Sequence, residues 1–149
     1  MTEILFYHLT ESTLENALPA LLERSLARGW RVVVQAGSEE RRDALDAHLW
    51  TFRDDSFLAH GIDSDPHAPD QPVLLTTGSG NANTAQIRFL VDGAEPPALD
   101  GYDRAVFMFD GHDEAQLEGA RGHWKRLKGE GHELTYWQQS AGGRWERKA

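Results

Sequence analysis

Arg31-Val-Val-Val-Gln-Ala36 is the stretch that decides the fold class. Three consecutive valines without polar alternation favour a parallel strand that is buried on both faces. The segment before it, 13–28, carries leucines at helical spacing and is expected to form an amphipathic helix that Gly29 ends. Ser12 and Glu15 have the spacing of a capping box at the start of this helix. Pro19 lies inside the helix, where we expect it to kink or restart the helix.

Outward from this unit, apolar runs alternate with helical patterns along the whole chain. Further strands are expected at 3–8, 72–76, 86–91, 104–109, 133–138 and 144–146. Further helices are expected from the Ser38 cap to Trp50 and over about 112–128. Strands that alternate with helices predict an α/β protein with a largely parallel, twisted sheet and helices on both faces. A length of 149 residues suits a single domain, 1–149, with one core.

The composition excludes several classes of protein. The chain has no cysteine, so disulfides and zinc sites with cysteine ligands are excluded. No apolar run reaches the roughly 18 residues of a membrane span, and the first residues lack the pattern of a signal peptide, so a cytoplasmic location is expected. The net charge of −9 argues against a protein that wraps duplex DNA, because that mode of binding needs many cations on one surface.

The positive charge is concentrated at the end of the chain. Residues 121–149 hold seven basic and three acidic side chains, a net of +4, which leaves −13 for residues 1–120. Such an asymmetry can serve an acidic partner, although a solvated helix face and tail would show the same charge.

The helix expected over 112–128 places its cations beside its apolar stripe. With Leu117 at 0° and about 100° per residue, Trp124 falls near −20°, Lys128 near +20°, Arg121 near +40° and Lys125 near +80°. An apolar floor with a cationic rim suits a peptide that is acidic and apolar, such as a chain terminus with its carboxylate. The alternative stays open that Trp124 belongs to the core and that the cations extend along it into water.

Two other pairs of residues stand out. Trp50 and Phe57 flank a non-periodic segment and are candidates for exposed anchors at a protein interface, although large aromatics in such places are more often parts of the core. Gly119 and Gly122 weaken the last helix by roughly 1 kcal/mol each relative to alanine. We expect these glycines to allow a close approach to the helix.

A catalytic site has little support in the sequence. The seven histidines have no serine or cysteine nucleophile signature nearby, so no catalytic, cofactor-binding or metal-ligating residue is assigned. The Gly78–Asn83 loop lacks the lysine of a phosphate-binding loop, and Asp110–Asp113 is better explained as the cap of the next helix. The enzyme alternative is a nucleotide- or sugar-phosphate-binding α/β protein that uses these two segments. A third alternative, single-stranded DNA along residues 121–149, is the weakest because the net charge there is small.

The order of several short motifs resembles the chi subunit family of bacterial DNA polymerase III holoenzyme. The matching stretches are Ile4-Leu5-Phe6-Tyr7, Leu45-Asp46 to Leu49-Trp50, Asp55-Ser56-Phe57-Leu58-Ala59-His60, Pro72-Val73-Leu74-Leu75, Ala120-Arg121 to Trp124-Lys125 and Gly131-His132-Glu133-Leu134. The resemblance covers nearly the whole chain, with a poor match over 63–71 and 93–103. Each motif is weak alone, whereas their order and spacing together are fairly specific.

The resemblance implies a Rossmann-like α/β domain that is not an enzyme and binds no nucleotide. It implies a clamp-loader accessory subunit that binds the acidic C-terminal tail of single-stranded-DNA-binding protein through Arg121, Trp124 and Lys125. Lys128 is an addition suggested by its place on the helix. A second surface with Trp50 and Phe57 would bind the psi subunit of the clamp loader, or a helicase partner in some bacteria. DNA would then be reached only indirectly, through these partners.

Overall fold

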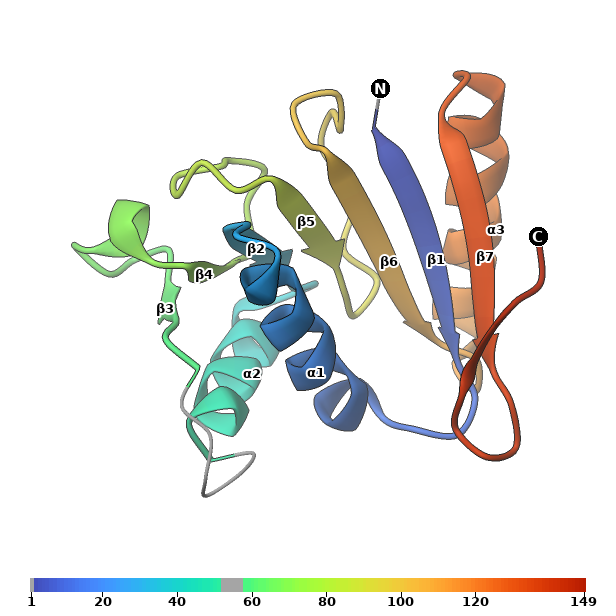
Figure 1. The fold of residues 1–149 in the computed structure, drawn as a ribbon, viewed down its shortest axis with the longest axis horizontal. Coiled ribbons are helices and arrows are strands. Elements are labelled where there is room, and N and C mark those ends of the chain that lie inside the picture. Colours follow the sequence, from blue (N-terminus) through green and yellow to red (C-terminus); the bar gives the residue numbers. More distant parts are fainter. Residues whose placement is uncertain (1, 52–57) are drawn as a thin grey trace.

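The computed structural model describes residues 2–51 and 58–149, and its centre is one mostly parallel β-sheet (Figure 1). Eight strands lie in the order β3-β4-β2-β5-β6-β1-β7-β8, and within these residues only the β7–β8 pair is antiparallel. The strands are β1 (Glu3–Leu9), β2 (Val32–Gln35), β3 (Gly61–Ile62), β4 (Val73–Thr76), β5 (Ile87–Leu90), β6 (Arg104–Asp110), β7 (Glu133–Gln139) and β8 (Trp145–Arg147). The expected α/β class and largely parallel sheet are confirmed, while a single Rossmann-like domain stays a prediction.

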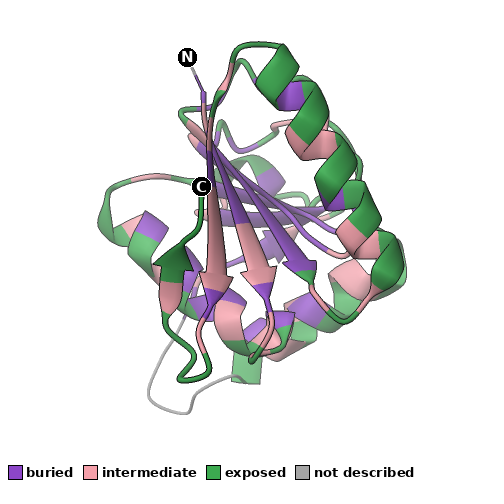
Figure 2. Cartoon of the chain, turned by 90° about the vertical axis from the view of Figure 1, so that its right-hand side faces the viewer, coloured by how far each residue is buried: buried purple, intermediate pink, exposed green. Residues whose placement is uncertain are grey.

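Helices cover both faces of the sheet. The helices are α1 (Leu14–Ala27), α2 (Glu39–Thr51) and α3 (Glu114–Gly129), with a short 3₁₀ helix η1 at Ala68–Asp70. The core cluster that holds leucines of α1 and α2 is separate from the one that holds Ala120 and Leu127 of α3. Figure 2 shows the buried residues concentrated in the strands, while α3 presents mostly exposed residues to solvent. None of the helices in the described residues is long and apolar enough to cross a membrane.

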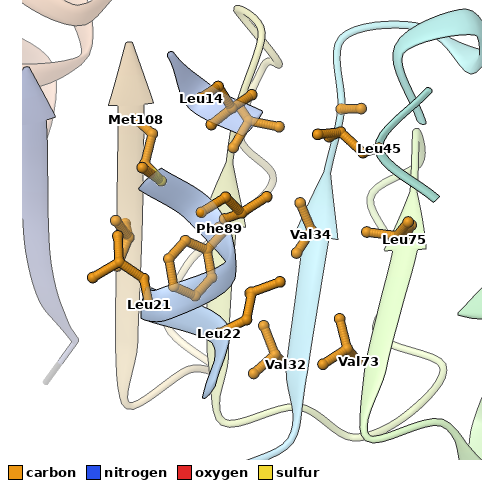
Figure 3. Packing of buried hydrophobic residues seen from close by; sticks show 14 of the residues in the cluster. Leu14, Leu21, Leu22, Val32, Val34, Leu45, Val73, Leu75, Phe89 and Met108 are labelled. Atoms are coloured by element: carbon orange, nitrogen blue, oxygen red, sulfur yellow. The ribbon is translucent and has the colours of Figure 1, made fainter. Parts of the chain in front are cut away.

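The three valines of β2 explain the two layers of core. All three are fully buried, but Val32 and Val34 pack with the cluster under α1 and α2, whereas Val33 packs with the cluster on the α3 side. Figure 3 shows Val32 and Val34 beside Leu22 of α1 and Phe89 of β5. Side chains of a strand alternate between faces, so a run that is apolar at every position must be covered on both sides.

The start of α1 differs from the sequence expectation in two ways. The N-cap is Thr13, whose side chain accepts a hydrogen bond from the Asn16 amide, and Ser12 instead accepts one from the Gln139 side chain. The predicted capping box of Ser12 and Glu15 is therefore wrong. The helix also runs without interruption through Pro19, which contradicts the expected kink or restart.

A histidine from α2 provides the hydrogen bond that Pro19 cannot. Pro19 has no amide hydrogen for the Glu15 carbonyl one turn earlier, and such a carbonyl needs another donor. The Nε2 atom of His48 lies 2.7 Å from this oxygen. The proline therefore leaves the Glu15 carbonyl of α1 free to accept a hydrogen bond, and His48 of α2 donates it.

Two elements were not expected from the sequence. β3 and η1 lie outside all the strands and helices expected from the sequence, and a strand of two residues is too short to show any periodicity. The close approach expected at Gly119 and Gly122 is also absent within the described residues. A Cβ atom built on either glycine meets no atom of another part of the described chain within 4 Å.

Candidate functional site

An apolar pocket of about 450 Å³ lies between α3 and the sheet, and it contains most of the predicted peptide-binding residues. Its lining consists of His8, Phe109, Leu117, Ala120, Arg121, Trp124, Lys125 and Tyr136. Arg121, Trp124 and Lys125 are thus brought together, as the helical wheel predicted. Lys128 is not part of the lining, although its Nζ atom lies 5.9 Å from the centroid of the Trp124 ring.

The position of α3 is fixed by its N-cap and by two residues that are buried in the core. The Asp113 carboxylate accepts hydrogen bonds from the amides of Ala115 and Gln116, so of the two predicted candidates, Asp110 and Asp113, the second is the N-cap. Ala120 and Leu127 are buried against the sheet. Because Ala120 is so small, the helix leaves space beside it for the pocket.

Trp124 is both a part of the core and a part of the pocket surface, the two alternatives that the sequence left open. Its ring packs edge-on against Phe6 in the core, with centroids 5.3 Å apart, and against Tyr136 at 5.9 Å. It is only half-buried, and the rest of its surface forms a wall of the pocket. Its contacts with Phe6 and Tyr136 therefore hold the tryptophan in place, as a wall for an apolar ligand needs to be.

The cations at the rim have little to neutralise them. Arg121 makes a single long ion pair, 3.5 Å, to Glu118 on the same exposed helix surface. Such exposed pairs contribute little binding free energy. No carboxylate of the described residues pairs with Lys125. Both cations are therefore available to an acidic ligand.

The floor of the pocket comes from three strands and was missed by the sequence reasoning. The Tyr136 hydroxyl lies 2.6 Å from Nδ1 of His8, and the His8 ring stacks on Phe109 with centroids 4.9 Å apart. Burial lowers the pKa of His8, and the nearby charges of His112 and Arg121 lower it further, while Asp110 raises it. Burial also raises the pKa of Tyr136. At neutral pH the floor is thus uncharged, and the charge is confined to the rim.

Trp50 lies at the end of α2, far along the sheet from this pocket. It is 53% exposed, and its ring lies 4.5 Å from that of the buried His60. Phe57, its predicted companion, lies outside the described residues.

The Gly78–Asn83 loop turns its carbonyl groups inward, toward a buried arginine. The guanidinium of Arg88 donates to the carbonyls of Gly78 and Gly80, at 2.6 and 2.9 Å. A phosphate-binding loop instead presents several amide hydrogens to its ligand. The loop therefore has a structural role in the described chain.

Asp110–Asp113, the other segment of the enzyme alternative, is also engaged in local bonds. Asp110 accepts from the His112 amide, and Asp113 caps α3. Two clefts of about 320 and 290 Å³ open beside this segment, but no residue of the Gly78–Asn83 loop lines either of them. Among the described residues, no group of three acidic, histidine or cysteine side chains could hold a metal ion.

Comparison with known proteins identifies relatives of this chain. The family model described as "DNA polymerase III chi subunit, HolC" matches residues 1–135. The probable DNA polymerase III subunit chi of Rickettsia prowazekii is 24% identical over 91 residues, which are 61% of this chain and only 55% of that relative. The DNA polymerase III subunit chi of Pseudomonas aeruginosa is 23% identical over 137 residues, 90% of this chain and 94% of the relative.

The family match runs from β1 into β7 and so includes every residue that lines the pocket except Tyr136. The chain belongs to the DNA polymerase III chi subunit family, whose members are accessory subunits of that polymerase and not themselves catalytic.

Proposed function

We propose that this accessory subunit binds the acidic C-terminal tail of single-stranded-DNA-binding protein in the pocket beside α3. The observation that carries this proposal is the combination of apolar walls with a rim of two cations that have little to neutralise them. The apolar walls would accept a large apolar side chain, and Arg121 and Lys125 would pair with carboxylates around it. Lys128 extends the rim over the outer edge of Trp124.

The negative charge of the rest of the molecule favours binding of an acidic peptide at this rim over binding elsewhere. Residues outside the basic end carry a large negative charge, so an acidic peptide is repelled elsewhere and attracted at this rim. A short tail buries little area, so the binding should be weak to moderate. Such binding would couple this subunit to other replication proteins without a catalytic step in the pocket.

We further propose that the Trp50 end of the sheet binds the psi subunit, or a helicase partner. An exposed tryptophan is a common anchor at protein interfaces, and the neighbouring His60 ring supports this one from behind. The two binding surfaces are on different elements, α3 and α2. One molecule could therefore hold both partners at the same time and link them.

A peptide titration tests the tail site directly. The probe is a fluorescent peptide with the acidic, apolar character of such a tail, titrated against the wild-type chain and the Arg121→Ala and Lys125→Ala variants. Each loss of a rim cation is expected to weaken binding by about 1 kcal/mol, roughly fivefold.

The matched control is Arg126→Ala, which removes the same charge from α3 away from the pocket. Equal affinity of Arg121→Ala and the wild type would reject the site. Equal weakening by Arg121→Ala and Arg126→Ala would show that only net charge matters.

A further inference from the structure

One half of the sheet face that carries α1 and α2 has no helix over it in the described part of the chain. α1 packs on β2 and β6, and α3 packs on the opposite face of β6 and β7. Figure 1 shows α1 and α2 in front of the left part of the sheet, with no helix in front of β1 and β7. No helix within residues 2–51 and 58–149 therefore covers the side chains on this open part.

Three aromatic side chains cluster there. Tyr7 of β1 and Trp137 of β7 are direct partners in the strand register, with ring centroids 6.4 Å apart. Trp145 of β8 lies 4.7 Å from Tyr7. All three pack against the edge of the α1 and α2 core and remain partly exposed. They form an aromatic surface on an open sheet.

Three arginines border the same surface. Arg24, Arg28 and Arg104 line a narrow groove of about 90 Å³ between α1 and the sheet, and Tyr7 lines it too. The guanidinium groups of Arg28 and Arg104 also stack on Trp30, at 4.0 and 5.3 Å from its ring centroid. We call these seven side chains the Arg–aromatic face: Tyr7, Arg24, Arg28, Trp30, Arg104, Trp137 and Trp145.

The charge of this face is poorly compensated by the described chain. Arg104 pairs with Glu3 at 2.6 Å, but no described carboxylate pairs with Arg24 or Arg28. This is notable in a chain with nine more acidic than basic residues. The Tyr7 hydroxyl has no hydrogen-bond partner among the described residues; burial raises its pKa, Arg104 and Arg24 lower it, and Glu3 raises it. Positive charge and an unused hydroxyl thus surround one groove.

We infer that the Arg–aromatic face binds single-stranded DNA, with its phosphates at Arg24, Arg28 and Arg104 and its bases stacked on Tyr7, Trp137 and Trp145. Arginines that follow a phosphate backbone beside aromatic rings are the recurring chemistry of single-strand binding. A duplex would leave the rings unused, because its bases are already stacked. An acidic, apolar peptide fits the pocket beside α3 better, because that pocket of about 450 Å³ can enclose a large apolar side chain and the groove here is only about 90 Å³. DNA is favoured over RNA because the family serves a DNA polymerase.

This site differs from the basic segment 121–149 that the sequence suggested for single-stranded DNA. Its arginines come from α1, the C-cap of α1 and β6, and its rings come from four separate parts of the chain. It also differs from the peptide pocket, which lies on the opposite face of the sheet. It departs from the expectation that DNA is reached only indirectly.

Fluorescence anisotropy with a labelled thymidine oligonucleotide at low salt tests this inference on the full chain. The wild type should bind, and Arg24→Ala and Arg28→Ala should each bind less tightly. Each should also flatten the slope of log affinity against log salt by about 0.7, the value for one phosphate contact on a single strand. Arg24→Lys keeps the charge and should retain most of the affinity. Trp145→Leu should weaken binding roughly fivefold or more without changing the salt slope.

Arg126→Ala is the matched control, since this arginine lies on α3 and lines neither site. It should bind DNA as the wild type does, as should Arg121→Ala, while Arg24→Ala should bind the acidic peptide normally. Melting temperatures within a few degrees of the wild type would establish that the variants are folded. No binding by the wild type, or equal losses for Arg24→Ala and Arg126→Ala, would overturn the inference. So would tighter binding of the matching RNA, or displacement of the DNA by polyglutamate at equal charge, which would indicate an acidic protein ligand.

Discussion

Arg88 shows how one buried side chain can shape a loop. It is completely buried in β5, and its five donor hydrogens are all used by neutral acceptors: the Gln35 side chain, the Gly78 and Gly80 carbonyls and the Tyr102 hydroxyl. A buried charge is tolerated only when it is fully hydrogen-bonded. The arginine therefore holds the Gly78–Asn83 loop in place from inside.

Replacement of Arg88 should be among the most destabilising substitutions in the chain. Arg88→Met is expected to lower the free energy of unfolding by about 2–4 kcal/mol, because several buried acceptors lose their donor. Urea denaturation measures the change. The exposed Arg126→Met is the control and should stay within about 0.5 kcal/mol of the wild type. Similar values for the two variants would contradict the role assigned to Arg88.

Two partly buried histidines, His8 of β1 and His123 of α3, are expected to make the fold sensitive to acid. Burial lowers the pKa of His8 and of His123, so the folded protein binds their protons less readily than the unfolded chain does. Their contribution to stability is complete above the ordinary histidine pKa of about 6.5 and is lost as the pH falls through the lower folded-state values. The melting temperature should therefore fall between pH 7 and 5. His8→Gln should reduce this fall, and an unchanged pH profile would contradict the argument.

At the scale of residues, the rim of the pocket could be predicted and its floor could not. Arg121, Trp124 and Lys125 share one helix, whose 3.6-residue period places them together without knowledge of the fold. His8, Phe109 and Tyr136 meet only because β1 lies between β6 and β7. Strand order follows from packing between distant segments, and no local pattern in the sequence encodes it.

Among the helices and strands, α3 contains two glycines that lower its stability. Gly119 and Gly122 are helical residues with open space where a Cβ would be, so neither is needed for packing in the described chain. The glycines therefore cost helix stability without a compensating contact.

Alanine at these two positions should stabilise the protein. Gly119→Ala and Gly122→Ala are each expected to raise the free energy of unfolding by up to about 1 kcal/mol, measured by thermal or urea denaturation. Gly37→Ala is a useful contrast, because its Cβ would meet the Asp92 carbonyl oxygen at 2.3 Å and should destabilise the fold. Loss of stability in either α3 variant would show a contact that the described residues lack.

The boundaries of the elements were predictable where a local signal exists. The Asp113 cap and the valine run of β2 are both carried by adjacent residues, and both are confirmed. The kink expected at Pro19 was wrong because His48, thirty-three residues beyond the Glu15 carbonyl, donates to that oxygen. From the sequence, the effect of a proline can be predicted only from the helix that contains it. Here the hydrogen bond that Pro19 removes from α1 is replaced by one from α2.

For the molecule as a whole, two opposing fields act on an acidic ligand. The body of the chain is negative and repels it, while the rim of Arg121 and Lys125 attracts it at short range. At physiological salt, charges more than about 8 Å apart are largely screened, so the rim dominates at contact.

Binding of the acidic peptide should therefore weaken as salt is added, because the rim pairs are exposed. Lys125→Ala should make the affinity less dependent on salt than it is in the wild type. Titrations at several ionic strengths measure both slopes. Affinity that rises with salt would mean that the negative body, and not the rim, controls the encounter.

The place of β1 in the sheet has a consequence for how the molecule is made. β1 is the first strand of the chain, yet its neighbours β6 and β7 begin at Arg104 and Glu133. At about 5–20 residues per second, a ribosome needs roughly 5–20 s to add the next hundred residues. During that time the apolar strand lacks both of its native neighbours, so we expect β1 to be prone to aggregation until they are made.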